Sequence, residues 1–225
     1  MMEKKYKLTE ETINVDGRTL YRIEALKDFD VVEKGDKGGF IENESNLSQS
    51  GDCWVYGNAK VSDNAMVCGN AKVYGNARVY GNALVCDNAQ VRDNAVVYDN
   101  AQVYGNAKVF ENAEVSFDAK VYDDAKVYEY AMVQGNAKVY GNAEIRTNAC
   151  IYGDAIIDSI GDYIVFKNFW SSGRSFTWTR SNDMWKVGCF YGTGEELIKK
   201  AYKESEISGR EYERIVKYVE TIKKK

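Results

Sequence analysis

A repeat of six residues runs through residues 55–157 without a gap. An aliphatic residue, Val or Ile, stands at every sixth position from Val55 to Ile157, and Ala stands four residues after each of them from Ala59 to Ala155. The consensus unit is Val-Tyr-Gly-Asn-Ala-x. A fixed period that continues for this long indicates a solenoid of identical small units, whatever the propensities of single residues.

The six-residue unit suits one side of a triangular coil of three short parallel strands, so that a full coil takes eighteen residues. We expect Val to point inward from the middle of each side and Ala to lie near the corner, where a larger side chain would clash. The Gly-Asn pair falls at the turn between sides, because both residues tolerate a left-handed backbone. Each coil hydrogen-bonds only to its neighbours, so the stack needs capping units at its ends.

The two ends of the chain differ from the repeat and predict such capping units. In the first forty residues, Asp16-Gly17 is a hairpin turn signal between stretches of strand-like sequence. The spacing of six begins at Ile41 and slips near Asp52, which predicts a small bulge early in the solenoid. We therefore divide the chain into an N-terminal β capping unit (1–40), a hexapeptide-repeat β-solenoid (41–158) and a C-terminal α+β module (159–225).

The C-terminal module is predicted to contain three antiparallel strands and two helices. The strands are expected at 163–166, 175–179 and 184–190. Thr193 and Glu196 form a capping-box pair that opens a helix ending near Glu204, and Ser208 with Glu211 repeats this signature for a second helix. The predicted fold class is therefore mainly β, a parallel solenoid with a small N-terminal β cap and a C-terminal α+β module.

The repeat resembles the hexapeptide-repeat, left-handed parallel β-helix, and the wider chain resembles a phage and prophage family of uncharacterised β-solenoid proteins. The wider resemblance is carried by Leu20–Phe29, Gly35–Glu42, Asn46–Ser48 and Cys53–Tyr56. The stretch Gly-Cys-Phe-Tyr-Gly-Thr at 188–193 resembles a GCFxGT-type C-terminal module that is often attached to that family. The resemblance implies a left-handed coil, a homotrimer and a place in the cytoplasm of an infected host, and it implies little about activity.

The composition argues against several functions. The sequence has no His among its 225 residues, and its net charge is −4. Acyltransferases with the hexapeptide repeat use a His general base, and β-helical carbonic anhydrases hold zinc with three His, so neither chemistry can be mounted here in its usual form. We expect no catalytic residue, no metal site and no cofactor. A negative chain without a long apolar stretch also predicts a cytoplasmic protein with no DNA and no membrane partner.

Two of the five cysteines are placed to meet. Cys68 and Cys86 are eighteen residues apart and should stack on adjacent coils at one exposed position. A disulfide between them is sterically allowed. A reducing cytoplasm favours free thiols, and free thiols are our prediction.

A ligand site is predicted in the C-terminal module. The loop 170–175 carries hydroxyl groups and Arg174, whose guanidinium suits bidentate contacts with phosphate or carboxylate. Gly192-Thr193 lies at a predicted helix N-terminus, where backbone N–H groups favour anions, and antiparallel strands would bring it to the same end of the sheet as the loop. The candidate ligand residues are Ser171, Ser172, Arg174, Ser175, Thr177, Trp178, Gly192 and Thr193. The plainer interpretation, an ordinary hairpin loop, a capped helix and core tryptophans, stays open.

Residues eighteen apart should stack in columns on the outside of the solenoid. One such column contains Tyr56, Tyr74, Arg92, Phe110, Tyr128 and Arg146. Contacts between rings, or between Arg and a ring, stabilise neighbouring coils by about 0.5–1 kcal/mol per pair at exposed sites. The same column is also a candidate subunit interface.

The repeat is least regular at 111–130. There Asp118, Asp123 and Asp124 take positions that Gly and Asn hold elsewhere. Three interpretations stay open for these residues: acidic turn residues, a cation site, and a deviation of the repeat that is shaped for a partner.

Three functional hypotheses follow from the sequence. The first is a non-enzymatic binding protein, in which a rigid oligomeric solenoid presents a site for an anionic small molecule, a nucleotide signal for example, or for a host protein, and sequesters it. The second is a structural or assembly scaffold without a ligand. The third is an acyl or nucleotidyl transferase of the hexapeptide type, against which the missing His weighs.

Overall fold

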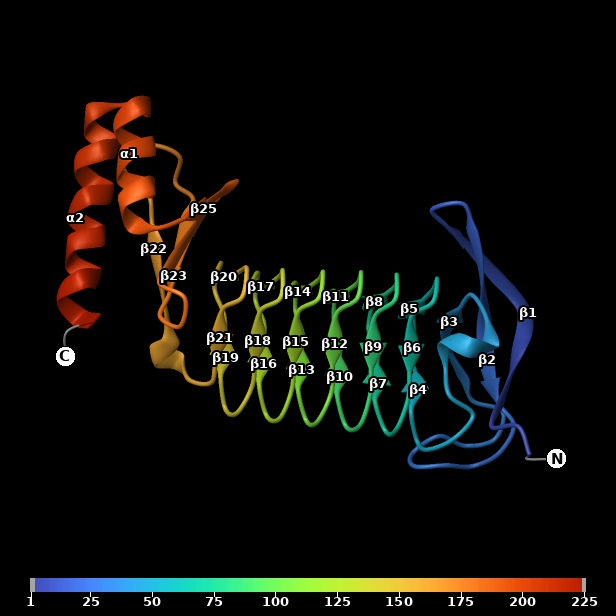
Figure 1. Cartoon of the computed structure of the whole chain (residues 1–225). Helices are drawn as coiled ribbons and strands as arrows, with labels where there is room; N and C mark the ends of the chain where they lie inside the picture. The colour runs from blue at the N-terminus through green and yellow to red at the C-terminus, as the bar shows by residue number, and fades with distance from the viewer. Residues whose placement is uncertain (1–2, 224–225) are drawn as a thin grey trace.

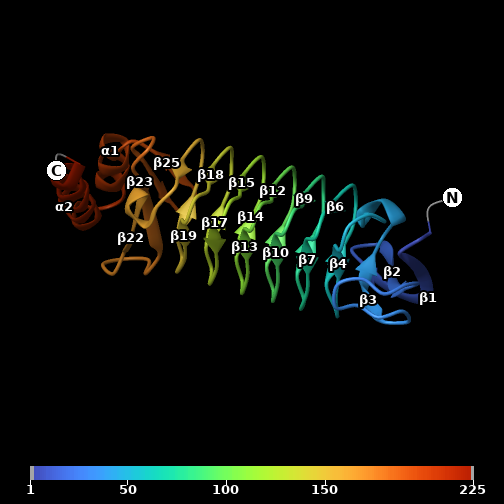
Figure 2. The same ribbon diagram turned by 90° about the horizontal axis from the view of Figure 1, so that it is seen from below.

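The computed structural model describes residues 3–223 and shows a straight parallel β-solenoid with a different unit at each end (Figure 1). Seen from below, the coils follow one another as parallel layers between an N-terminal antiparallel unit and a C-terminal unit of sheet and helices (Figure 2). The mainly β fold predicted from the repeat is confirmed. Neither helix of the described chain combines the length and the apolar composition that a membrane crossing requires.

Three parallel sheets form the sides of the solenoid, and successive strands of each sheet are eighteen residues apart. The first sheet contains β5 (Lys60–Val61), β8 (Arg78–Val79), β11 (Val96–Val97), β14 (Glu114–Val115), β17 (Met132–Val133) and β20 (Cys150–Ile151). The second contains β4 (Trp54–Val55), β7 (Lys72–Val73), β10 (Gln90–Val91), β13 (Lys108–Val109), β16 (Lys126–Val127) and β19 (Glu144–Ile145). The third contains β6 (Met66–Val67), β9 (Leu84–Val85), β12 (Gln102–Val103), β15 (Lys120–Val121), β18 (Lys138–Val139) and β21 (Ile156–Ile157).

The interior of the solenoid is built from the two invariant positions of the repeat. Every Val or Ile from Val55 to Ile157 is 0% exposed, and every Ala from Ala59 to Ala155 is at most 1% exposed. Burying a Val side chain contributes roughly 1.5–3 kcal/mol to the free energy of folding. Each coil buries the same kinds of side chain, so each adds a similar amount of stability to a continuous core. The predicted inward positions are therefore confirmed.

The corners of the coil use a left-handed residue once per side. From Gly57 to Gly153, every sixth residue has a φ between 56° and 74°. This is the first residue of the Gly-Asn pair, whereas the Asn that follows is not among the positive-φ residues. The irregular stretch keeps the same geometry, since Phe117 and Glu129 both have a φ of 59°.

Acidic corner residues gain a hydrogen bond that Gly lacks. The carboxylate of Asp87 accepts from the backbone N–H of Gly105, one coil further on, at 3.1 Å. Asp123 accepts from Gly141 in the same way at 3.3 Å. This contact offsets part of the cost of about 1–2 kcal/mol that a non-Gly residue has in the left-handed region.

The asparagines form hydrogen-bonded columns along the rod. From Asn64 to Asn94, each side-chain amide of the columns donates to the amide oxygen of the Asn one coil further on, as Asn70 does to Asn88 at 3.1 Å and Asn88 to Asn106 at 3.1 Å. Two columns end where carboxylates accept the last amide, at Asp118 (3.0 Å) and Asp124 (3.1 Å). The three acidic residues of the irregular stretch thus serve as corner and column acceptors. Residues 3–223 contain no group of three or more acidic, Cys or His side chains placed to hold a metal ion.

The N-terminal unit is a hairpin that continues into the solenoid. It contains β1 (Tyr6–Val15), β2 (Arg18–Ala25) and β3 (Lys37–Ile41), followed by the short helix η1 (Glu44–Asn46). The turn Asp16-Gly17 is where the sequence predicts it, with φ values of 52° and 83°. Strand β3 pairs in parallel with β5, so the boundary predicted at residue 40 falls inside a strand that both units share.

Two side chains of the N-terminal unit close the first coil. The Tyr6 hydroxyl donates to the backbone carbonyl of Leu47 at 2.7 Å, and the fully buried Lys5 ammonium donates to that of Cys53 at 2.9 Å. The N-terminal end of the solenoid exposes backbone carbonyls with no preceding coil to bind them, and these donors satisfy two of them.

The C-terminal module has one strand more than predicted. Its elements are η2 (Ile160–Asp162), β22 (Tyr163–Lys167), β23 (Ser175–Thr179), β24 (Met184–Val187), β25 (Phe190–Gly192), α1 (Gly194–Glu204) and α2 (Glu206–Lys223). The stretch predicted as one strand from residue 184 to 190 is divided by a turn at Gly188, whose φ is 54°. Thr193 caps α1 as predicted. The predicted cap of the second helix is wrong, because α2 begins at Glu206 and the hydroxyl of Ser205 accepts from the Ser208 N–H.

The module is fixed to the last coil by side chains that bind exposed backbone. The Thr177 hydroxyl accepts from the Cys150 N–H at 2.9 Å, and the Ser181 hydroxyl accepts from the Ile156 N–H at 2.7 Å. The Tyr163 hydroxyl donates to the Glu144 carbonyl at 2.8 Å. These contacts orient β23 across β20, and they place the module over the side of the solenoid formed by β5 to β20.

Cys68 and Cys86 form a disulfide between adjacent coils, with their Cα atoms 4.7 Å apart. Our prediction of free thiols at these positions is therefore wrong. The coil stacking that the repeat predicts brings the two side chains within bonding distance, and this proximity decides the outcome. The remaining cysteines, Cys53, Cys150 and Cys189, are free thiols.

Candidate functional site

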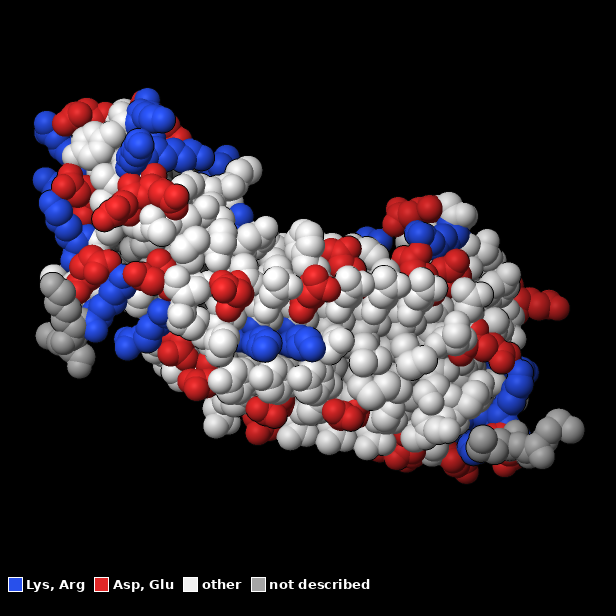
Figure 3. All heavy atoms as spheres, in the orientation of Figure 1, with Lys and Arg blue, Asp and Glu red and all other residues white. Residues whose placement is uncertain are grey.

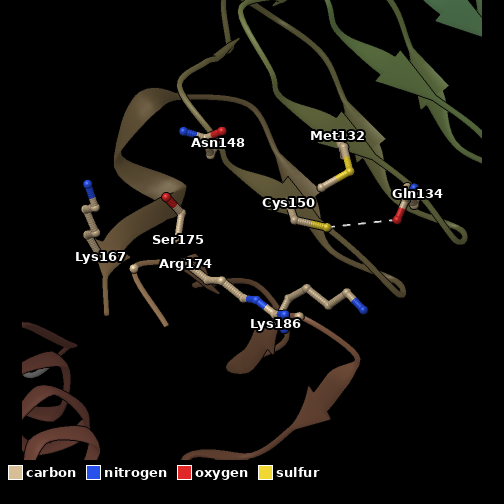
Figure 4. Close-up of a pocket in the computed structure, with 10 residues that line it drawn as sticks. Met132, Gln134, Asn148, Cys150, Lys167, Arg174, Ser175 and Lys186 are labelled. Carbon is tan, nitrogen blue, oxygen red and sulfur yellow. Dashed lines mark hydrogen bonds between the residues drawn. The ribbon is translucent and has the colours of Figure 1, made fainter. Parts of the chain in front are cut away.

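An open groove of about 570 Å³ lies where the module meets the solenoid (Figure 4). The solenoid side of the groove is formed by residues of β17, β20 and the turns beside them, and the module side by residues of β22, the 168–174 loop, β23 and β24. The lining residues are Met132, Gln134, Asn148, Cys150, Lys167, Gly173, Arg174, Ser175, Lys186 and Gly188. The two sides are held together by the Thr177 contact to Cys150, so the shape of the groove is set by backbone on both sides.

The module side of the groove is positively charged. Lys167 ends β22, Arg174 precedes β23 and Lys186 lies on β24, so three neighbouring strands each supply a cation. No acidic residue lines the groove, and these three side chains form no ion pair within residues 3–223. In the close-up, the Arg174 side chain extends toward Lys186 (Figure 4). The ammonium of Lys186 also lies over the Tyr152 ring, 4.4 Å from its centroid, which fixes its position at the solenoid edge.

The solenoid side of the groove is uncharged. Gln134 and Asn148 supply amides, and Met132 and Cys150 supply an apolar wall. Burial raises the pKa of the Cys150 thiol to about 11, so this group stays protonated at neutral pH and adds no negative charge. The groove therefore offers cations on one side, with hydrogen-bonding and apolar groups on the other.

The predicted ligand residues are divided by the fold. Arg174 and Ser175 line the groove, and Ser171 and Ser172 line an adjoining pocket of about 240 Å³ that shares Arg174 with it. Thr177 is buried, and its hydroxyl binds the last coil. Trp178 is 0% exposed, and its indole N–H donates to Asp183 at 2.8 Å. It is a core residue, so it has no free face on which a ring could stack.

Gly192 and Thr193 lie at the other end of the sheet from the loop, so the prediction that they meet Arg174 is wrong. Gly192 pairs with Trp185, which in turn pairs with Trp178, whereas Arg174 lies beside Gly188 at the opposite end of these strands. The additional turn at Gly188 reverses the chain once more and causes this separation. The Thr193 N–H donates to the Glu196 carboxylate at 2.9 Å, so the start of α1 is capped by its own side chains.

The aromatic column predicted on the outside lies on a different side of the solenoid from the groove. Its contacts include Tyr56 edge-on to Tyr74 at 6.4 Å, Arg92 over the Phe110 ring at 4.2 Å, and Phe110 stacked on Tyr128 at 4.9 Å. Arg146 follows Tyr128 in register, because Val127 pairs with Ile145. The column thus connects coils over the whole second sheet.

Sequence reasoning missed the residues that make the groove basic and half apolar. Lys167 and Lys186 belong to short strands without any motif, so no sequence signal marks them. The spacing of eighteen does place Met132 and Cys150 in one column, but it does not reveal that the module covers this column and not one of the other two.

The three free thiols should differ strongly in their reactivity. We expect iodoacetamide at neutral pH to label Cys189 well before Cys150, because Cys189 is exposed, while Cys150 is 8% exposed and its raised pKa leaves little thiolate. Peptide mass spectrometry over a time course would measure the order, with protein unfolded in urea as the control in which all free thiols react. Labelling of Cys150 as fast as Cys189 would contradict the burial described above.

A comparison with protein-family models matches residues 71–87 to the YdcK β-solenoid repeat. The matched stretch contains β7, β8 and β9, which form one complete turn around the three sides. No curated protein matches the chain. The repeat match and the three-sided parallel coil together support a place for this chain among the β-solenoid families, similar to the YdcK repeat.

Proposed function

We propose that this chain is a non-enzymatic binding protein in which a rigid solenoid presents an anion-binding groove. One observation carries the proposal: Lys167, Arg174 and Lys186 face a groove in which no lining residue is acidic. Cations kept together without counter-charges repel one another, and a bound anion relieves this repulsion. The free energy gained when the anion binds is larger in a groove partly shielded from water than on an open surface.

The lining favours a small molecule with both a charged and an uncharged part. Arg174 offers a planar fork that suits a carboxylate or phosphate, and the two lysines add point charges. Gln134 and Asn148 can hydrogen-bond a polar ring, while Met132 can pack against it. An anionic metabolite, nucleotides included, is the class of ligand that fits these groups, and the protein would act by holding it unaltered.

The biological setting is proposed from the resemblance of the repeat and of the GCFxGT-type module. In that setting the protein works in the cytoplasm of a phage-infected host, assembles as a homotrimer, and sequesters a host signalling metabolite or binds a host protein. The mostly half-buried column from Tyr56 to Arg146 is the proposed subunit interface, since its rings and arginines lie along one whole sheet.

A structural scaffold is the second candidate function. The continuous asparagine columns favour it, because they connect successive coils into a stiff rod that could hold two end units at a fixed distance. A scaffold of this kind needs no ligand and would not respond to changes in the groove.

Arg174 provides the test, and Arg180 provides a matched control, since the two arginines flank β23 at its opposite ends. Native mass spectrometry of protein purified gently from a host-like lysate is expected to show additional mass that denaturation releases. Arg174→Ala should lose this mass and Arg180→Ala should keep it. A protein without added mass, or a mass retained equally by both variants, would exclude the groove as the site and favour the scaffold.

A further inference from the structure

The two end units of the rod frame a hollow on one side of the solenoid. The β1–β2 hairpin and the C-terminal module both rise from the side that carries β5 to β20, and the space-filling view shows the depression between them (Figure 3). A small pocket beside Asp16 and Arg78 forms one inner corner of the depression, and the basic groove forms the other. We call this depression the saddle; its floor is the outer surface of β11, β14 and β17.

The floor of the saddle is apolar and aromatic at its centre, apart from Glu114, and the acidic corner residues Asp93, Glu111 and Glu129 form a row along one edge of it. Val96 and Met132 point outward from β11 and β17, and Tyr80 and Tyr98 stack beside them with their rings 5.1 Å apart. Glu114 lies between Val96 and Met132, where it accepts hydrogen bonds from the Tyr98 hydroxyl at 2.6 Å and the Gln134 amide at 3.1 Å. The floor is therefore already hydrogen-bonded, and it presents rings and aliphatic groups to an incoming partner.

The two walls of the saddle differ in charge. On the hairpin wall, Arg78 binds Asp16 at 3.0 Å and Arg18 binds Asp63 at 2.5 Å, so these two positive charges are paired. Lys60 lies beside them, and its ammonium donates to the backbone carbonyl of Asn58 at 3.1 Å. On the module wall, Arg174 and Lys186 form no ion pair within the described chain. A partner in the saddle thus meets paired arginines and Lys60 on one side, and the unpaired Arg174 and Lys186 on the other.

The width of the floor suits a single helix. Neighbouring strands lie about 4.8 Å apart, so β11, β14 and β17 span roughly 10 Å between their outer members. An α-helix with its side chains is about 10–12 Å across. One helix laid across the rod would fill the floor and touch both walls.

We propose that the saddle binds an amphipathic, acidic helix of a partner protein. The helix lies across the solenoid with its apolar face on Val96 and Met132, an uncharged residue above Glu114, and a row of acidic side chains facing Arg174 and Lys186. The charges of the walls favour this orientation, since Arg174 and Lys186 on the module wall form no ion pair while Arg78 and Arg18 on the hairpin wall are paired. This inference rests on the proposed function, because it uses the same cations, Arg174 and Lys186, as the anion site. It differs in the ligand, since the anionic groups are carboxylates of a polypeptide.

A displayed library of single-helix peptides tests the inference directly, because such a selection needs no named partner. Peptides selected on the protein are expected to carry an apolar stripe and a net negative charge. Each selected peptide, labelled with a fluorophore, is then titrated against variants with Val96→Glu or Met132→Glu on the floor, and we expect its affinity to fall by about tenfold or more. Leu84→Glu is the matched control, because Leu84 holds the same repeat position on the third sheet.

The outcomes separate this inference from the proposed function. Selection of neutral or basic peptides, failure to select any, or equal affinity for the floor variants and the Leu84→Glu control would overturn the helix inference. If the helix inference fails in one of these ways but the protein still carries a small anion that Arg174→Ala loses, the proposed function is supported and only the helix inference is overturned. Thermal unfolding of both floor variants, compared with the control, shows whether a lost affinity reflects the surface or the fold.

Discussion

Val97→Asp is expected to unfold the solenoid, whereas Val96→Asp, one residue earlier on the same strand, should leave it folded. Val97 is 0% exposed in the stack of buried Val side chains, while Val96 points outward into the saddle. A carboxylate at position 97 would be buried without a partner, at a cost of more than about 4 kcal/mol, which is a large part of the roughly 5–15 kcal/mol that stabilises a typical domain.

Urea denaturation followed by circular dichroism would measure the difference between the two variants. Val96→Asp should change the free energy of unfolding by no more than roughly 1 kcal/mol, as surface changes usually do. Similar losses in both variants would show that the two positions are not on opposite faces of β11, and this would contradict the assignment of the interior.

The second large effect concerns deletions, which should obey the period of the coil. Removal of residues 92–109 joins Val91 to Phe110 and takes out one whole coil of eighteen residues, so the protein should fold into a shorter rod. Removal of residues 92–97 takes out one side, so the coil should still form, with the module rotated by a third of a turn relative to the hairpin. Removal of residues 92–94 shifts every later Val out of the core and should prevent folding of the stack.

Circular dichroism, thermal unfolding and small-angle X-ray scattering would check the deletion series. The loss of residues 92–97 is also informative for the two proposals. It leaves the basic groove intact, because β17, β20 and the module move as one unit, but it removes Val96 from the floor and carries the hairpin wall away from the saddle. Retained anion binding with lost helix binding is the expected result. A folded protein after removal of residues 92–94 would contradict the coil register.

The solenoid could be predicted from sequence because its structure is local and repeated. Val and Ala fix the interior, and the spacing of eighteen fixes which side chains stack, as the contact of Arg92 with Phe110 shows. The expected reducing compartment predicts free thiols at Cys68 and Cys86, whereas the spacing of eighteen predicts that they meet. The structure has a disulfide there, so the spacing is the better predictor at these positions.

The groove could be predicted only in part because it depends on contacts between distant segments. Arg174 was identified from its chemistry, but the turn at Gly188 reverses the chain and moves Thr193 to the far end of the sheet. The choice of the covered side depends on hydrogen bonds from the module to the last coil, made by Thr177, Ser181, Tyr163 and Asn182, and none of them has a sequence pattern. Lys167 and Lys186 come to line the same groove only once β22 and β24 have paired with β23.

The asparagine columns also give the rod a direction. Each amide donates toward the C-terminal end and accepts from the other, so Asp118 and Asp124, which accept and have no proton to donate, act as terminators. Within residues 3–223, no side-chain amide bond between asparagines continues beyond them. Ring contacts, in contrast, occur along the rod from Tyr56 and Tyr74 near the hairpin to Tyr122 and Tyr140 near the module. The half of the rod near the hairpin therefore has asparagine seams in addition to ring contacts, and within the described residues the half near the module lacks these seams.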